Sequence, residues 1–199
     1  MIQHRLLQPA DYVRMPWKDG GGRTTQIASH PAGATLAAFD WRVSIAEVAA
    51  DGPFSRFPGV DRTIVMIAGA GMRLEGDGHA VDLRAPYEPY TFSGDDGIAC
   101  VLVAGPVRDF NLMLRRGRAQ GRLIVVRDAG ARIAPARFRV CYAAVGALEC
   151  LLPGHPPLTL AADHAVVVED DGAAAGAPFA LNPLTGDAVA LVVAIELAA

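Results

Sequence analysis

The 199-residue chain has few cysteines and no long apolar run. Its three cysteines (Cys100, Cys141 and Cys150) lie in apolar runs without paired spacing, which indicates buried free thiols in a reducing compartment. The longest apolar stretches, such as residues 188–194, are far too short to span a bilayer. The N-terminus shows no apolar segment followed by a small-residue cleavage site, so we expect a cytoplasmic protein that is not held in a membrane.

Charge of either sign is also scarce. Charged residues make up 20% of the chain, and the net charge of −3 corresponds to a pI near 5.9. Nucleic acids and acidic membranes need a basic surface, so we expect neither as the main partner. The arginine cluster at residues 115–122 has no aromatic residues between its charges for stacking on bases, and we interpret it as a solvated face. A docking surface for a protein partner is the alternative.

Helical patterns are scarce as well, whereas short apolar or alternating runs recur between Gly, Pro and Asp residues. Residues 39–45 alternate cleanly between an apolar and a polar face, as a strand with two different faces does. Apolar residues make up 52% of the chain, enough for a sizeable core. Many short strands at even spacing predict an all-β fold, a closed sandwich or barrel.

Residues 52–69 resemble the first metal-binding motif of cupins, in which two histidines and a later glutamate precede a strand that ends in glycine. With that glycine at Gly69, the histidine positions fall on Ser55 and Phe57, and the glutamate position falls on Arg62. None of these can serve as the usual ligand, because serine and phenylalanine lack an imidazole and a guanidinium has no lone pair to donate. The motif therefore predicts a cupin-like site without its metal ligands.

The second cupin motif normally adds one more histidine. The corresponding stretch here, residues 86–92, offers Tyr90 or Thr91 instead. The five histidines of the chain are scattered without ligand spacing. We therefore expect neither a metal nor another cofactor.

A guanidinium at the glutamate position inverts the charge of the site. An arginine in a partly dry cavity binds a carboxylate or phosphate through paired hydrogen bonds, so we expect a small anionic metabolite near Arg62. Pairing of Arg62 with a neighbouring acid such as Asp61 or Asp95 explains the residue about as well. The sequence leaves both interpretations open.

Three further segments contribute candidate residues. Residues 41–44 put an arginine and a serine on one strand face, which meets either a pocket or solvent. Residues 15–25 contain three consecutive glycines after Lys18, which could contact an anion, although a tight hairpin explains them as well. In residues 105–116, Asp109 and Asn111 share a polar face. The candidate ligand-binding residues are Arg62, Ser55, Phe57, Arg42, Ser44, Tyr90, Trp17, Lys18, Asp109 and Asn111.

Catalytic signatures are missing from the sequence. No serine or cysteine lies in a Gly-x-Ser-x-Gly turn or in a recognisable Cys/His context, and no acid–base pair stands out. We therefore assign no catalytic residue and favour binding over catalysis.

Five segments together resemble the HutD/Ves family: MPWKDGGGRTTQIA (residues 15–28), FDWRVSIAEV (39–48), GPFSRFPGVDRTIVMIAGAGMRL (52–74), FSGD (92–95) and GPVRDFNLMLRRG (105–117). They occur in the family's order and cover much of the first 117 residues. Asp19 departs from the pattern, because many relatives would carry asparagine there.

The resemblance implies a cupin-like fold, a double-stranded β-sandwich or jelly roll with two halves in one chain (a bicupin), over residues 1–117 and 118–199. It also implies an association with histidine utilisation and a regulatory role, with N-formylglutamate or urocanate as the class of ligand. A metal-independent isomerase or hydrolase acting on a similar small acid is the alternative function. We leave open whether the chain forms a homodimer.

Overall fold

The computed structural model describes residues 2–17, 20–171 and 178–198, and within these ranges the chain forms strands and turns without a helix. The predicted all-β fold is confirmed. Because the described residues contain no helix, they also contain none that is long and apolar enough to cross a membrane.

The chain divides into two compact units, one of Tyr12–Ala119 and one of Met1–Asp11 with Gln120–Ala199. We refer to these as the central unit and the terminal unit. The break after Ala119 lies close to the division that we expected after residue 117. The first residues differ from expectation, because β1 (Ile2–Leu7) pairs antiparallel with β17 (Ala165–Asp170) in the terminal unit. Local patterns reveal a strand but not a partner so distant in sequence.

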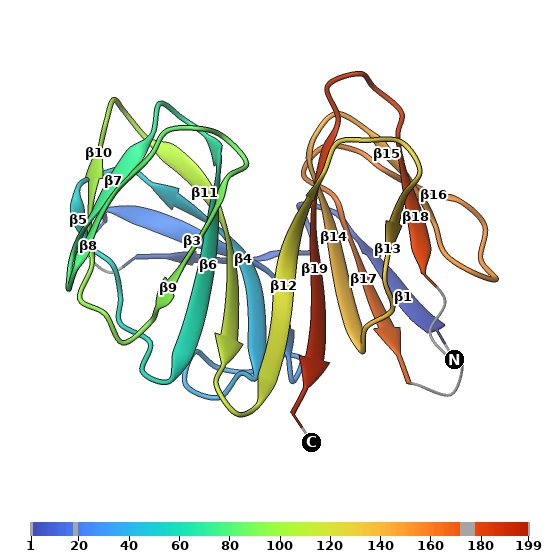
Figure 1. Cartoon of the computed structure of the whole chain (residues 1–199), viewed down its shortest axis with the longest axis horizontal. Helices are drawn as coiled ribbons and strands as arrows, with labels where there is room; N and C mark the ends of the chain where they lie inside the picture. The colour runs from blue at the N-terminus through green and yellow to red at the C-terminus, as the bar shows by residue number, and fades with distance from the viewer. Residues whose placement is uncertain (1, 18–19, 172–177, 199) are drawn as a thin grey trace. The chain divides into compact units, whose positions relative to one another are not determined.

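The central unit is a sandwich of two antiparallel sheets (Figure 1). The six-stranded sheet has the order β2 (Val13–Pro16), β3 (Gly22–His30), β4 (Trp41–Val48), β11 (Val107–Arg115), β6 (Val60–Ala68) and β9 (Pro89–Ser93). The four-stranded sheet has the order β5 (Gly52–Pro53), β10 (Ala99–Leu102), β7 (Met72–Gly76) and β8 (His79–Leu83).

The terminal unit is also built from two sheets. The five-stranded sheet has the order β1, β17, β14 (Phe138–Val145), β19 (Val189–Leu197) and β12 (Ala119–Val126). The four-stranded sheet has the order β13 (Ala131–Ile133), β18 (Phe179–Pro183), β15 (Leu148–Leu151) and β16 (Leu158–Leu160).

The two units repeat one topology. Strands β4 to β11 of the central unit and β12 to β19 of the terminal unit follow one another in the same order and take the same neighbours in their sheets. The sheet order β4-β11-β6-β9 corresponds to β12-β19-β14-β17, and β5-β10-β7-β8 corresponds to β13-β18-β15-β16. Strands β1, β2 and β3 are additions to this shared framework. Each strand of the shared framework in one unit therefore has a counterpart in the other.

The inner face of the six-stranded sheet changes from apolar to polar along its strands. At one end its residues pack against the four-stranded sheet in a buried cluster that includes Ala46, Ile64, Met66, Met72 and Leu74. Towards the other end the same faces of β4, β6 and β11 carry polar side chains, which the side-chain period of two places on one surface. The candidate site lies there.

Candidate functional site

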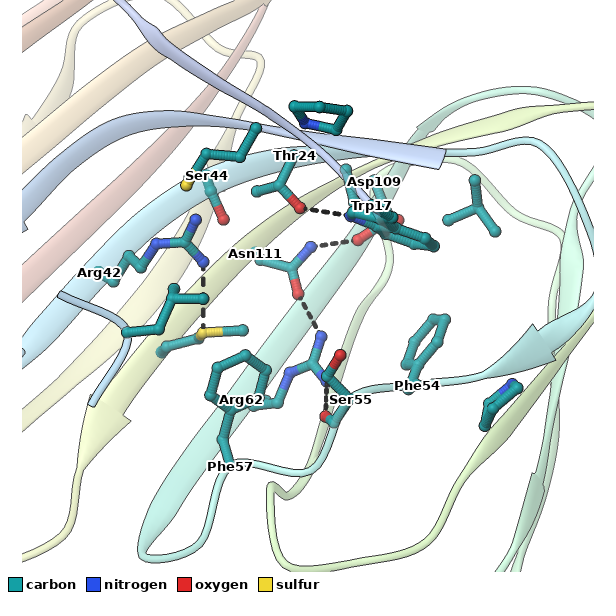
Figure 2. Close-up of a pocket in the computed structure, with 17 residues that line it drawn as sticks. Trp17, Thr24, Arg42, Ser44, Phe54, Ser55, Phe57, Arg62, Asp109 and Asn111 are labelled. Atoms are coloured by element: carbon teal, nitrogen blue, oxygen red, sulfur yellow. Dashed lines mark hydrogen bonds between the residues drawn. The ribbon is translucent and has the colours of Figure 1, made fainter. Parts of the chain in front are cut away.

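A cavity of about 420 Å³ opens on this polar end of the central unit (Figure 2). Volumes of this size suit a small molecule. The lining side chains come from the inner face of the six-stranded sheet, from the β2–β3 hairpin, from the connection between β3 and β4, and from β5 with the segment that leads to β6. They are Met15, Pro16, Trp17, Thr24, Leu36, Arg42, Ser44, Ala46, Val48, Pro53, Phe54, Ser55, Phe57, Arg62, Asp109, Asn111 and Met113.

Strand register aligns the two arginines of the cavity. Met113 on β11 is paired with Arg42 on β4 and with Arg62 on β6, so the three residues form one row across adjacent strands. Neighbouring strands lie about 4.8 Å apart, which puts the two arginine backbones about 10 Å from each other. The side chains share one face of the sheet and can both reach one small ligand.

Arg62 is buried, with 7% of its surface exposed, and its guanidinium is held by neutral groups. Nη2 donates to Oδ1 of Asn111 at 2.9 Å, and Nη1 makes a long hydrogen bond of 3.4 Å to the carbonyl oxygen of Ser55. Nε has no hydrogen-bond partner among the described residues. No acidic side chain in the described ranges lies within the 4.0 Å of an ion pair with Arg62, so its charge is left without a direct counterion.

Aromatic rings surround the Arg62 guanidinium. Its central carbon lies 5.3 Å from the ring centre of Phe54, 5.5 Å from that of Phe57 and 5.0 Å from that of Phe92. Such contacts attract a cation but do not neutralise it. Burial lowers the pKa of Arg62 to about 10, an effect that Asp109 opposes and Arg42 reinforces. The residue stays protonated at neutral pH, and the aromatic contacts fix its position.

Arg42 is the second buried cation, with 3% of its surface exposed. Its Nε donates to Oε1 of Gln26 at 2.7 Å, and Nη1 approaches the sulfur of Met113 at 3.9 Å. Burial lowers the pKa of Arg42 to about 10. Figure 2 shows Arg42 to the left of Asn111 and Arg62 below it, with both side chains entering the same space.

Asp109 and Asn111 lie on β11 next to this pair of cations. The Asn111 amide donates from Nδ2 to Oδ1 of Asp109 and accepts at its own Oδ1 from Arg62, so it links the carboxyl group to the guanidinium. Asp109 is 1% exposed. Burial raises the pKa of Asp109 to about 7, although Arg62 and the Asn111 hydrogen bond both lower it. With two guanidiniums and one carboxyl group of raised pKa, the cavity carries a net positive charge at neutral pH.

The glycines of the β2–β3 hairpin place Trp17 at the cavity. Gly20 has a positive φ of 73°. A Cβ on Gly22 would lie 2.2 Å from the carbonyl oxygen of Glu47 and 3.0 Å from the Trp17 ring, so only glycine lets the strand and the ring pack this closely. The Trp17 indole nitrogen donates to the Thr24 hydroxyl at 2.9 Å, which fixes the ring orientation. Gly22 thus has a packing role, whereas Gly20 supplies a backbone conformation with positive φ.

Most of the predicted site residues converge on this cavity. Eight of them line it: Arg62, Ser55, Phe57, Arg42, Ser44, Trp17, Asp109 and Asn111. Tyr90 does not, because it lies on β9, where its ring stacks on Phe92 at 6.0 Å and packs against the apolar cluster. Lys18 lies outside the described residues. Ser55 contributes its backbone carbonyl to Arg62, and Phe57 its ring.

The acids that we considered as partners of Arg62 pair elsewhere. Asp61 and Asp95 are exposed, and both accept hydrogen bonds from Arg116. Two neighbours in the arginine cluster also have partners within the chain: Arg115 donates to the carbonyl oxygen of Phe39, and Arg118 lies 3.8 Å from Asp40. Much of the cluster therefore stabilises the turn around β11 and its neighbours.

Several residues that line the cavity or hold its side chains were missed in the sequence. Met113 continues the alternation of Asp109 and Asn111, so the period of two could have found it. Gln26, which holds Arg42, comes from β3, and only the pairing of β3 with β4 brings it there. Phe54 immediately precedes the motif position of Ser55 and had no signal of its own.

The site does not fit the metal that cupins usually hold. Among the described residues that line the cavity there is no histidine or cysteine, and Asp109 is the only one with a carboxyl group. The guanidinium of Arg62, at the glutamate position of the motif, would repel a cation. Among the described residues, no three His, Cys, Asp or Glu side chains converge in a metal-binding arrangement.

The terminal unit has a counterpart of Arg62. Arg139 lies on β14, the counterpart of β6, and precedes Gly146 by the same number of residues as Arg62 precedes Gly69. Both glycines have positive φ values, 68° and 106°. Arg139 is fully buried and lies 5.1 Å from the centre of the Phe179 ring.

Arg139, unlike Arg62, has an acidic partner. Its Nη2 lies 3.7 Å from Oδ2 of Asp170, which is also buried. The Asp170 amide donates to the carbonyl oxygen of Arg137, just as the Gly94 amide donates to that of Val60 in the central unit. Asp170 therefore stands where the central unit has Gly94. In the terminal unit an aspartate supplies the carboxylate that Arg62 lacks.

The fold defines the class of the protein as cupin-like. The oxalate decarboxylase of Lactobacillus farciminis, solved as a formate complex, superposes with a TM-score of 0.65 over 97% of this chain and 85% of that chain, at 7% identity. At that identity the similarity concerns the fold alone.

The chain belongs to the HutD family, whose model matches residues 9–189. HutD from Pseudomonas fluorescens SBW25 superposes with a TM-score of 0.83, with 32% identity, over 98% of this chain and 99% of that one. The resemblance inferred from the sequence motifs is confirmed.

Two relatives match part of the chain. An uncharacterized 21.2 kDa protein in the hutC 3′ region of Pseudomonas putida is 43% identical over 123 residues, 62% of this chain and 64% of that protein. Protein Ves of Citrobacter koseri is 36% identical over 119 residues, 58% of this chain and 61% of that protein. The chain thus matches less than two thirds of the length of each of these relatives.

Proposed function

We propose that this chain is a metal-independent cytoplasmic protein that binds a small carboxylate metabolite between Arg42 and Arg62, as a regulator or sensor linked to histidine utilisation. The observation that carries the proposal is the unpaired charge of Arg62. A buried charge is costly unless it is paired and hydrogen-bonded. Arg139, the counterpart of Arg62 in the terminal unit, is paired with Asp170, so the topology that the two units share accommodates a carboxylate beside such an arginine.

The remaining lining agrees with a small organic acid. The rings of Trp17, Phe54 and Phe57 offer apolar surface for the body of a ligand, and most of the polar groups come from the inner sheet face. Sites of this composition, largely apolar with a few convergent polar groups, are typical of small-molecule binding. The family relationship suggests N-formylglutamate or urocanate as the class of ligand, and both carry carboxylates.

Calorimetric titration of the purified protein with N-formylglutamate and with urocanate tests the proposal. We expect saturable binding of at least one of them. Arg62→Ala should weaken it by roughly 2–5 kcal/mol, as for the loss of one partner of a buried charge pair. Arg73→Ala removes an equally charged but exposed side chain from β7 and should leave the affinity unchanged. A folded protein that binds no small carboxylate would refute the proposed function.

Catalysis on a similar acid is the second candidate, and Asp109 is the observation that favours it. Burial puts the pKa of this carboxyl group at about 7, where a group can both give and accept a proton. An isomerase or hydrolase would use it as an acid–base residue. NMR spectra of N-formylglutamate and urocanate incubated with the protein distinguish the two candidates. Unchanged spectra of a compound that binds would exclude its conversion and leave binding as the function.

A further inference from the structure

Asp109 is a buried carboxyl group inside a cavity that otherwise favours anions. Its Oδ1 accepts the hydrogen bond from Asn111, whereas its Oδ2 is buried without a hydrogen-bond partner among the described residues. A carboxylate oxygen in that position lacks the donors that would stabilise its charge. A protonated oxygen would instead present a hydroxyl donor.

The groups packed around Asp109 provide little charge. Its register partners are Ala46 on β4 and Met66 on β6, both apolar. Arg62 on β6 is the cation that acts on it, without direct contact. Asp109 also acts on Cys100 of β10: burial, together with the charges of Asp109 and Asp51, raises the pKa of this thiol to about 12, so the thiol is neutral.

A bound carboxylate would change this balance. It would pair with the guanidiniums of Arg62 and Arg42 and thereby cancel the positive charge that keeps Asp109 ionised. Two carboxylates in one dry site cannot both remain charged at low cost, because each disfavours the ionised form of the other. Protonation of Asp109 relieves the repulsion and gives Oδ2 a proton to donate.

We propose that the cavity binds its carboxylate ligand together with one proton, which passes from solvent to Oδ2 of Asp109. This inference rests on the proposed function and adds its regulation: the site takes up a carboxylate and H⁺ as a pair. Occupancy then follows pH as well as ligand concentration. At neutral pH the free protein holds Asp109 partly ionised, and the ligand-bound protein holds it protonated.

Calorimetry of the whole chain with N-formylglutamate measures this coupling, because the carboxyl groups of this probe stay ionised above about pH 6. Titrations in HEPES and in Tris, whose ionisation enthalpies differ, report the protons taken up. We expect uptake approaching one proton per ligand between about pH 7 and 8.5, and an affinity that falls up to about tenfold per pH unit there. Asp109→Asn should take up none and bind with nearly constant affinity over the same range.

Asp82→Asn is the matched control, since Asp82 is an exposed aspartate on β8 that pairs with arginines outside the cavity. It should retain the wild-type pH dependence. Difference infrared spectra of the wild-type protein provide a second measurement that needs no variant: a protonated carboxyl band should appear on ligand binding.

The outcomes separate this inference from the proposed function. Binding without proton uptake and without the infrared band overturns the coupling and leaves carboxylate binding intact. Asp109→Asn with an unchanged pH dependence also overturns it, because the proton would then reside elsewhere. A folded protein that binds no carboxylate at any pH overturns both.

Discussion

Arg62 of the central unit and Arg139 of the terminal unit hold equivalent places in one repeated topology, but only Arg139 has an acid beside it. The reason lies at the position that carries Asp170 in the terminal unit and Gly94 in the central unit. A Cβ on Gly94 would lie 2.6 Å from the carbonyl oxygen of Phe57 and 2.8 Å from that of Val60. The central unit therefore has no room for a side chain there, and the Arg62 charge remains available to a ligand.

Removal of Asp170 should destabilise the protein strongly. Asp170→Gly leaves Arg139 buried without its anion, and breaking such a pair costs about 3–5 kcal/mol. Urea denaturation measures the free energy of unfolding. Because the variant leaves a space beside a buried guanidinium, we expect formate to restore part of the stability, whereas an equal concentration of chloride restores less.

Asp128→Gly provides the comparison, since Asp128 is an exposed residue of the same unit. It should show neither the loss nor the formate effect. If Asp170→Gly is as stable as wild type, Asp170 does not stabilise the buried charge of Arg139. The comparison of Asp170 with a ligand carboxylate beside Arg62 would then be wrong.

Asp109 should make the protein less stable as pH rises. Its pKa is about 7 in the folded protein against an ordinary value of 3.8, so the folded state binds more protons between these values, and the free energy of unfolding falls as pH rises through that window. A shift of this size corresponds to roughly 4 kcal/mol. Asp109→Asn removes this dependence.

Urea denaturation of both proteins near pH 4.5 and near pH 8 measures the difference. We expect the stability of Asp109→Asn relative to wild type to increase from the lower to the higher pH. A difference that does not change with pH would show that Asp109 has an ordinary pKa in the folded protein.

An internal acid should block the site. Asn111→Asp places a carboxylate at the side chain that already accepts the hydrogen bond of Arg62, so it should partner this arginine as Asp170 partners Arg139. We expect N-formylglutamate binding to weaken at least about tenfold, because the ligand must displace or repel that charge. Calorimetry measures the affinity, and thermal unfolding checks that the variant is folded. Undiminished binding would place the ligand away from Arg62.

Metal removal should have no effect on binding. The side chains at the cupin motif positions, Ser55, Phe57 and Arg62, lack ligand atoms suited to a transition metal. Treatment with a chelator should therefore leave both the ligand affinity and the melting temperature unchanged, and elemental analysis should find no stoichiometric transition metal. A stoichiometric metal whose loss abolishes binding would contradict the proposed function.

Much of the candidate site could be predicted from local patterns. The side-chain period of two put Arg42 with Ser44, and Asp109 with Asn111, on shared strand faces. Motif spacing singled out Arg62. The pattern could not tell whether the polar face with Arg42 and Ser44 meets a pocket or solvent. The structure buries both residues on the inner face of the sheet.

Tyr90 shows the limit of the motif comparison. Its place in the second cupin motif suggested a pocket residue, but its side chain packs with Phe92 against the apolar cluster. Tyr90 shares the inner face with Phe92, but it pairs with Ile64 in the apolar part of that face, whereas Phe92 pairs with Arg62. The motif position does not specify which part of the face a side chain reaches, because this depends on the pairing of β9 with β6.

By itself, the sequence determined the all-β class, the family, and the identity of the charged residues that could meet an anion, because these depend on composition, spacing and alternation within short segments. Only the tertiary structure decided that Arg42 and Arg62 flank Met113, that Asn111 links Arg62 to Asp109, and that Asp170 pairs with Arg139. These relationships join strands that are far apart in the chain. Long-range pairing and burial, which set both the geometry and the pKa of Asp109, are properties of the folded protein.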